Sequence, residues 1–166
     1  MLHFRQTLVR MFFIAMAVFM TTSANAQSTV YLFMRSTNCF GEGGGTTVTI
    51  NGKDSFDMRG PFKKTMGNVA NPSLPLFMYH ASQKKCILKE EGKVLFAVDY
   101  NWTNGSGKTS DITAEIQLNL TEGFVHYIQI VPKGLNDLQF KILDEKKAAK
   151  LMKDKDYVSL PDYIEE

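Results

Sequence analysis

Residues 111–120, with the sequence DITAEIQLNL, decide the fold class because polar and apolar side chains alternate along them without a break. Successive side chains of a strand point to opposite faces, so a period of two puts every apolar residue on one face. These residues are Ile112, Ala114, Ile116, Leu118 and Leu120. The pattern predicts a strand with one face in a core and the other in water.

The segments on either side follow related patterns. Residues 30–34 are apolar on both faces, which predicts a strand covered on both sides. Asn51-Gly52 is the dipeptide most typical of a tight hairpin, so residues 46–50 and 53–58 are expected to pair. Further strands are expected at 76–80, 84–89, 93–100, 124–131 and 137–143, with an irregular connection at 60–75, a polar loop at 101–110 and a short helix at 144–153.

Seven or eight short strands joined by turns favour an all-β fold, and we expect an antiparallel β-sandwich with a short C-terminal helix. A barrel has the same strand pattern. No internal repeat or linker divides residues 27–166, so we expect them to form a single domain.

Residues 1–26 have the pattern of a secretory signal peptide. Arg5 and Arg10 precede a short apolar run, residues 11–20, and Ala24-Asn25-Ala26 matches the small-x-small cleavage motif. We expect cleavage between Ala26 and Gln27 and a periplasmic or secreted product. The alternative, an uncleaved anchor, requires a longer apolar run, so no membrane span is expected after cleavage.

The charge balance bears on the class of partner. The first 26 residues carry two of the 19 basic residues and none of the 17 acidic ones, so the remainder is close to neutral. A neutral chain has no strong field to attract nucleic acid, and we expect no nucleic-acid partner.

Export gives the two cysteines a possible role. Cys39 and Cys86 are an even pair, and an oxidising compartment favours a disulfide between them. Two separate buried thiols are the alternative.

No familiar catalytic or metal-binding pattern is complete. His80 and His126 remain after cleavage, but no Ser or Cys nucleophile motif accompanies them. The glycine-rich segment 41–45 lacks the Gly-Lys-Ser/Thr end of a phosphate loop, and Asp99, Asn101 and Thr103 lack the remaining ligands of a calcium loop. We therefore predict no catalytic residue, no metal site and no cofactor.

The candidate ligand-binding residues are Tyr100 and Trp102. Both lie next to the polar loop 101–110, where an outward-pointing ring could stack on a sugar or anchor a protein contact, although strand alternation favours core packing. The outward positions of the expected strands are mostly polar, so a partner is expected at an edge strand or at the two least regular loops, 39–45 and 100–110.

The order of segments resembles a known family. The strand VYLFMR at 30–35, VTINGK at 48–53, EGKV at 91–94, IQLNL at 116–120 and GFVHYI at 123–128 are followed by a closing strand and a Lys/Ala-rich helix. This order resembles the small exported bacterial β-sandwich domains grouped as a family of unknown function and often found on lipoproteins. The chain departs from them in lacking a lipidated Cys and in its glycine-rich insertion.

These observations predict a non-enzymatic binding or interaction module whose partner is an envelope protein or a glycan. A hydrolase of the periplasm or cell surface is one alternative. A structural envelope protein that pairs through a strand edge is the other.

Overall fold

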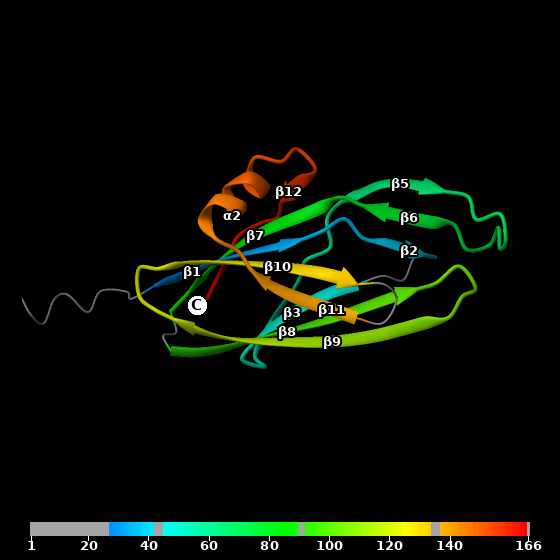
Figure 1. Cartoon of the computed structure of the whole chain (residues 1–166). Coiled ribbons are helices and arrows are strands. Elements are labelled where there is room, and N and C mark those ends of the chain that lie inside the picture. The colour runs from blue at the N-terminus through cyan, green and yellow to red at the C-terminus, as the bar shows by residue number, and fades with distance from the viewer. Residues whose placement is uncertain (1–26, 42–44, 90–91, 134–136, 166) are drawn as a thin grey trace, which may run out of the picture.

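The computed structural model describes residues 27–41, 45–89, 92–133 and 137–165. The predicted signal peptide and the centre of the glycine-rich segment lie outside these residues. The described chain forms an all-β sandwich with one short helix, which confirms the predicted fold class (Figure 1). Thirteen strands are present in the described part of the chain, because several short strands add to the predicted ones.

Sheet A is the larger layer, and β1 lies at its centre. Its strand order is β11-β10-β1-β7-β12, and β13 also pairs with β7. The strands are β1 (Ser28–Met34), β7 (Ala81–Leu88), β10 (Val125–Lys133), β11 (Asp137–Ile142), β12 (Tyr157–Ser159) and β13 (Tyr163–Ile164). The pairs β1/β10, β12/β7 and β13/β7 are parallel, whereas β1/β7 and β10/β11 are antiparallel.

Sheet C is the facing layer and is wholly antiparallel, in the order β4-β3-β8-β9. Its strands are β3 (Gly45–Ile50), β4 (Asp54–Asp57), β8 (Gly92–Thr103) and β9 (Thr109–Leu120). Asn51 and Gly52 both have positive φ, and the Lys53 amide donates to the Ile50 carbonyl at 3.0 Å. The predicted hairpin turn is therefore confirmed.

Sheet B is a small three-stranded extension in the order β2-β6-β5. It contains β2 (Asn38–Phe40), β5 (Phe62–Met66) and β6 (Leu76–Tyr79). Strand β5 lies inside the stretch that was predicted to be irregular. A strand can form there because Pro61, Pro72 and Pro75 lie before and after it and not within it. Figure 1 shows sheet B at the end of the molecule at which the β8–β9 hairpin turns.

One hydrophobic core fills the space between sheets A and C. Every second residue of β8 is buried in it; these residues are Val94, Phe96, Val98, Tyr100 and Trp102. β1 supplies Val30, Leu32 and Met34 to this core, while Phe33 is buried on its other face against Tyr157. The prediction that 30–34 is covered on both faces is therefore confirmed.

Helix α2 (Glu145–Met152) lies on the outer side of sheet A (Figure 1). The Asp144 side chain accepts a hydrogen bond from the Lys147 amide at 2.8 Å and caps the first turn, as Asp at an N-cap position commonly does. The predicted C-terminal helix is confirmed, and the chain after it forms an element that was not predicted. Residues 157–165, which we call the C-terminal strap, run along the free edge of β7.

Candidate functional site

An open cleft of about 610 Å³ lies next to Arg59. Three segments form it: the chain from β4 to β5, the end of β6, and the C-terminal strap. We call it the Arg59 cleft. Its lining residues are Asp57, Arg59, Gly60, Pro61, Phe62, Tyr79, Val158, Ser159 and Leu160.

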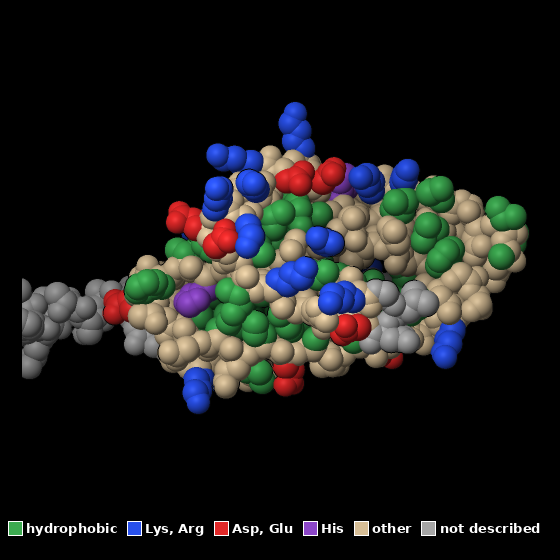
Figure 2. Space-filling model, in the orientation of Figure 1, with side chains coloured by type: hydrophobic (Ala, Val, Ile, Leu, Met, Phe, Trp, Pro, Cys, Tyr) green, Lys and Arg blue, Asp and Glu red, His purple; other side chains and the backbone are tan. Residues whose placement is uncertain are grey.

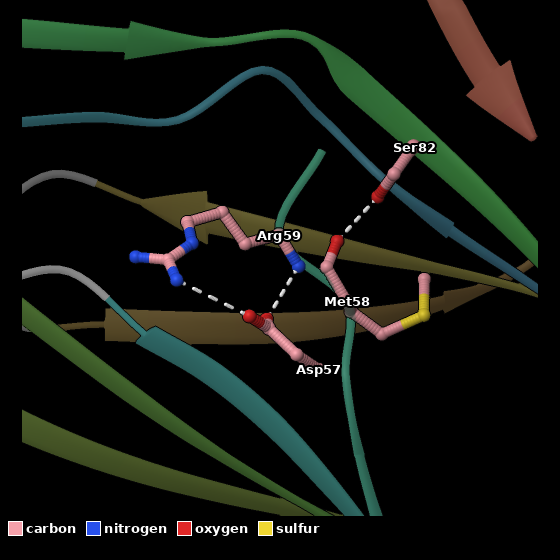
Figure 3. Close-up of polar contacts among 4 residues, drawn as sticks. All are labelled: Asp57, Met58, Arg59 and Ser82. Carbon is pink, nitrogen blue, oxygen red and sulfur yellow. Dashed lines mark hydrogen bonds and ion pairs between the residues drawn. The ribbon is translucent and has the colours of Figure 1, made fainter. Parts of the chain in front are cut away.

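The segment that carries Arg59 is held in place by hydrogen bonds that its backbone makes to the chain on both sides. The Met58 amide donates to the Thr46 carbonyl at 2.8 Å, and the Met58 carbonyl accepts a hydrogen bond from the Ser82 hydroxyl (Figure 3). The His80 amide donates to the Pro61 carbonyl at 3.0 Å. The Met58 side chain is fully buried, so the segment is anchored from the core as well.

Gly60 is required by close packing rather than by its backbone angles. A Cβ atom at this position would lie 2.1 Å from the carbonyl oxygen of His80, much closer than a carbon–oxygen contact allows. The absence of a side chain lets the segment lie directly against the turn between β6 and β7. This contact fixes the position of the neighbouring Arg59.

Arg59 is oriented by a carboxylate and a ring. Its Nη2 atom lies 3.4 Å from Oδ2 of Asp57, and its backbone amide donates to Oδ1 of the same residue at 2.7 Å (Figure 3). The guanidinium carbon lies 5.2 Å from the centre of the Tyr79 ring, within cation–π range. The side chain is 32% exposed and is therefore partly accessible to solvent.

An aromatic surface adjoins this charge pair. The Phe62 ring lies 6.3 Å from that of Tyr79 and 6.1 Å from that of Phe77. Phe62 is 54% exposed although it is fully apolar. Figure 2 shows hydrophobic side chains gathered at the end of the molecule formed by β5 and β6, where Met66 and Val69 are also exposed. These exposed apolar side chains belong to β5 and its neighbourhood, a stretch for which no strand was predicted.

The C-terminal strap forms the remaining wall of the cleft. Lys84, which is 8% exposed, donates from Nζ to the Pro161 carbonyl at 2.6 Å, and its ammonium group lies 4.9 Å from the centre of the Phe56 ring. The Leu160 amide donates to the Gln83 carbonyl at 2.8 Å. The strap thus joins the β7 edge of sheet A to the β4 edge of sheet C.

A second hollow, of about 420 Å³, lies at the other end of β6. We call it the Trp102 pocket. It is lined by Asn38, Phe40, Leu76, Trp102, Thr103, Asn104 and Gly105. Its residues come from the two regions in which the sequence placed a partner, next to segment 39–45 and at the β8–β9 turn.

The structure buries both aromatic residues that were predicted to bind a ligand. Tyr100 is 8% exposed and belongs to the core, where burial raises the pKa of its hydroxyl to about 12. Trp102 is 7% exposed and also lines the Trp102 pocket. A ligand contact at Tyr100 or Trp102 stays a prediction. The loop beside them is shorter than expected, since β8 and β9 leave only residues 104–108 between them.

Cys39 and Cys86 are not joined by the predicted disulfide. They are two separate buried thiols, which was the alternative interpretation of the sequence. They belong to strands of different sheets. Sγ of Cys39 accepts a hydrogen bond from the Thr103 amide at 3.2 Å, whereas Cys86 lies opposite Val30 in sheet A. Burial raises the pKa of the Cys86 thiol to about 12, which disfavours the reactive thiolate.

Neither His80 nor His126 lines the Arg59 cleft, although the His80 backbone contacts Gly60 and Pro61. His80 forms the turn between β6 and β7, and His126 pairs with Val30 in sheet A. The Ser82 hydroxyl donates to a backbone carbonyl. Within the described segments, no group of three or more His, Cys, Asp or Glu side chains is arranged to hold a metal ion.

The sequence alone did not predict the Arg59 cleft. Its residues are distant in the chain, and only the dipeptide Gly60-Pro61 with aromatic residues on either side of the irregular stretch hinted at it.

No family model, curated protein or solved structure significantly matches the chain. In the part of the chain that the structure describes, no helix has the length and apolar character needed to cross a membrane.

Proposed function

We propose that the protein is a non-enzymatic binding module exported to the bacterial envelope, and that the Arg59 cleft binds a glycan. The observation that carries the proposal is the exposed Phe62 ring, which lines the same open cleft as the Arg59–Asp57 pair. Binding pockets of this size combine apolar surface with a few fixed polar groups.

The chemistry of the cleft suits a sugar ring. A pyranose has an apolar face, which can stack on an exposed aromatic ring, and hydroxyl groups that both donate and accept hydrogen bonds. Phe62 and Tyr79 supply the rings. Arg59 supplies hydrogen-bond donors in a planar arrangement, and Asp57 supplies an acceptor. A sugar hydroxyl can therefore accept a hydrogen bond from Arg59 or donate one to Asp57.

The alternative function, a structural envelope protein that pairs with another chain through a strand edge, is less well supported at sheet B. Strand β5 is the outer strand of that sheet, but it carries Lys63 and Lys64 and its pairing with β6 shifts register between Phe62 and Lys64. Lysines and bulges on an edge strand are features that hinder pairing with another chain. The rings of the cleft are therefore the better candidate for contact with a partner.

Export is supported by the charged start, the short apolar run and the Ala24-Asn25-Ala26 motif. The resemblance to small exported β-sandwich domains of unknown function points the same way. We propose that the mature protein begins at Gln27 and acts in the periplasm or outside the cell, where envelope glycans are accessible.

The proposal is tested by binding envelope oligosaccharides to protein expressed from the full chain and purified after export. N-terminal sequencing of this sample should begin at Gln27. We expect Phe62→Ala to weaken glycan binding about tenfold, since a stacked ring contributes on the order of 1 kcal/mol. The matched control is Phe124→Ala, which removes a ring that is 64% exposed and does not line the cleft.

Three outcomes would contradict the proposal. Equal weakening by both variants would show that the Arg59 cleft is not the site. Retention of an envelope protein instead of a glycan would assign the cleft to protein recognition. Release of cleaved sugars, abolished by a single Asp, Ser or His substitution, would establish the hydrolase alternative.

A further inference from the structure

Sheet B carries apolar side chains that the sandwich leaves uncovered. The four residues of β6 are all apolar or aromatic, and each is only half-buried. Met66, at the end of β5, is 48% exposed, and Val69, in the connection between β5 and β6, is fully exposed. None of these residues belongs to the core between sheets A and C. Their apolar surface is therefore available to a partner outside the molecule.

Hydrogen bonds hold the connection between β5 and β6 in shape. Oδ1 of Asn68 accepts hydrogen bonds from the Ala70 and Asn71 amides at 3.0 and 3.2 Å. Nδ2 of the same side chain donates to the Gly105 carbonyl at 3.1 Å, which ties the connection to the β8–β9 turn. Val69 is thus presented to the solvent by a hydrogen-bonded turn.

The charges of β5, β6 and the neighbouring turn are all positive. Residues 58–89, which contain β5 and β6, include no Asp or Glu, and the connection 67–75 has no charged residue. Lys63 and Lys64 lie in β5 directly before it, and both are exposed. The β8–β9 turn adds Lys108 and no acid. On the face shown in Figure 2, this end of the molecule carries hydrophobic and basic side chains together.

This combination matches the surface of an anionic phospholipid bilayer. Apolar side chains at a protruding turn can enter the boundary between headgroups and acyl chains, while lysines beside them are attracted to the negative headgroups. A partner strand is disfavoured, because lysines on an edge strand hinder pairing with another chain. The chain after residue 26 is close to neutral as a whole, so attraction to a charged surface requires a local cluster such as this one.

We propose that the sheet B tip, which we define as Lys63, Lys64, Met66 and Val69, docks the protein on an anionic phospholipid membrane. Met66 and Val69 enter the interface, and the two lysines contact the headgroups. The docking is peripheral and independent of glycan binding, since none of the four residues lines the Arg59 cleft. Because Phe62 of the cleft precedes Lys63 in β5, docking places the cleft next to the membrane surface.

Vesicle sedimentation tests the proposal with the exported, purified protein. One kind of vesicle is made of phosphatidylcholine alone, and the other contains equal parts of phosphatidylcholine and phosphatidylglycerol, so neither offers a glycan. We expect binding to the mixed vesicles, at least about tenfold weaker binding to pure phosphatidylcholine, and release by added salt, which screens exposed charges. Absence of binding to the mixed vesicles, or equal binding to both kinds, would overturn the proposal.

A matched pair of variants tests the apolar contact. Val69→Asp replaces an exposed apolar side chain by a negative charge and should weaken binding to the mixed vesicles at least about tenfold. Phe124→Asp is the control, because Phe124 is also exposed and lies in the turn between β9 and β10, at the other end of the sandwich. Equal weakening by both variants would show that the added charge alone is the cause and would refute the tip as the contact.

A second pair tests the lysines. The double variant Lys63→Gln and Lys64→Gln should also weaken binding to the mixed vesicles about tenfold or more, since each lysine near an anionic surface adds attraction. The control with the same change of charge is Lys146→Gln and Lys150→Gln, both exposed on α2. Equal effects of the two double variants would contradict docking through sheet B.

Two further measurements separate this proposal from other contacts. The Val69→Asp variant should keep wild-type affinity for envelope oligosaccharides, because Val69 does not line the Arg59 cleft. Failure of membrane docking is thereby distinguished from failure of glycan binding. A dimer of the wild-type protein that Val69→Asp dissociates would assign the sheet B tip to a second copy of the chain and overturn membrane docking.

Discussion

At the scale of single residues, Gly60 shows how a candidate site depends on an absent side chain. The sequence predicted only that Gly60 begins an irregular connection. In the structure, the glycine allows the backbone before β5 to approach the His80 carbonyl, and Arg59 and Phe62 are positioned on either side of this contact.

We expect Gly60→Ala to destabilise the fold by about 1 to 3 kcal/mol, because a Cβ atom 2.1 Å from a backbone oxygen forces the chain to move. Urea unfolding measures the change. Gly67→Ala is the matched control, since nothing lies within 4 Å of a Cβ atom there and its backbone needs no positive φ. A similar loss of stability in both variants would show that close packing at Gly60 is not the cause.

At the scale of elements, the C-terminal strap contributes a wall to the Arg59 cleft. It has only two short strands, and it is held to β7 by backbone hydrogen bonds and by the Lys84 ammonium group. Lys84 adds a side-chain hydrogen bond to this attachment, and its ammonium group also lies against the Phe56 ring in the opposite sheet.

We expect Lys84→Met to loosen the strap while leaving the sandwich folded. Methionine keeps most of the apolar length of lysine but cannot donate to the Pro161 carbonyl. Hydrogen exchange of the Leu160 and Glu165 amides, which bond to Gln83 and Ile87 in β7, should become about tenfold faster. Lys93→Met, at an exposed position of β8, is the control. Unchanged protection of both amides in the Lys84 variant would contradict the role of this lysine.

At the scale of the whole molecule, two buried ionisable groups, Cys86 and Tyr100, make the free energy of unfolding depend on pH. The pKa of Cys86 rises from 9.0 to about 12, mainly because burial disfavours the thiolate. The pKa of Tyr100 rises from 10.0 to about 12, mainly by burial and secondarily through the charge of Cys39. Each group keeps its proton in the folded state at a pH at which the unfolded chain has lost it.

The stability of the fold should therefore decrease as the pH rises from 9 towards 12. Above pH 9 the unfolded state binds fewer protons than the folded state, so each further rise in pH favours unfolding. Urea midpoints measured at neutral pH and at increasing alkaline pH check this. Cys86→Ala should show a weaker dependence, because it removes one of the two groups. A midpoint that stays constant across this range would contradict the buried positions of both.

The local elements were largely predictable from sequence, because hydrophobic periodicity and turn chemistry act over a few residues. The alternation in 111–120, the Asn51-Gly52 turn and the Asp144-capped helix all correspond to elements of the structure. Strand alternation also favoured core packing of Tyr100 and Trp102, and both belong to the core.

The partners of these elements were decided only by tertiary structure. A strand's period reveals which face is apolar but carries no information about which strand lies beside it, so the parallel pairing of β1 with β10 and the return of the strap to β7 were not foreseen. The Arg59 cleft and the Trp102 pocket both arise from such distant pairings. Local sequence patterns were enough to specify an all-β chain with a defined core face. Long-range pairing specified where that core leaves hollows, since a cavity exists only between segments that folding has brought together.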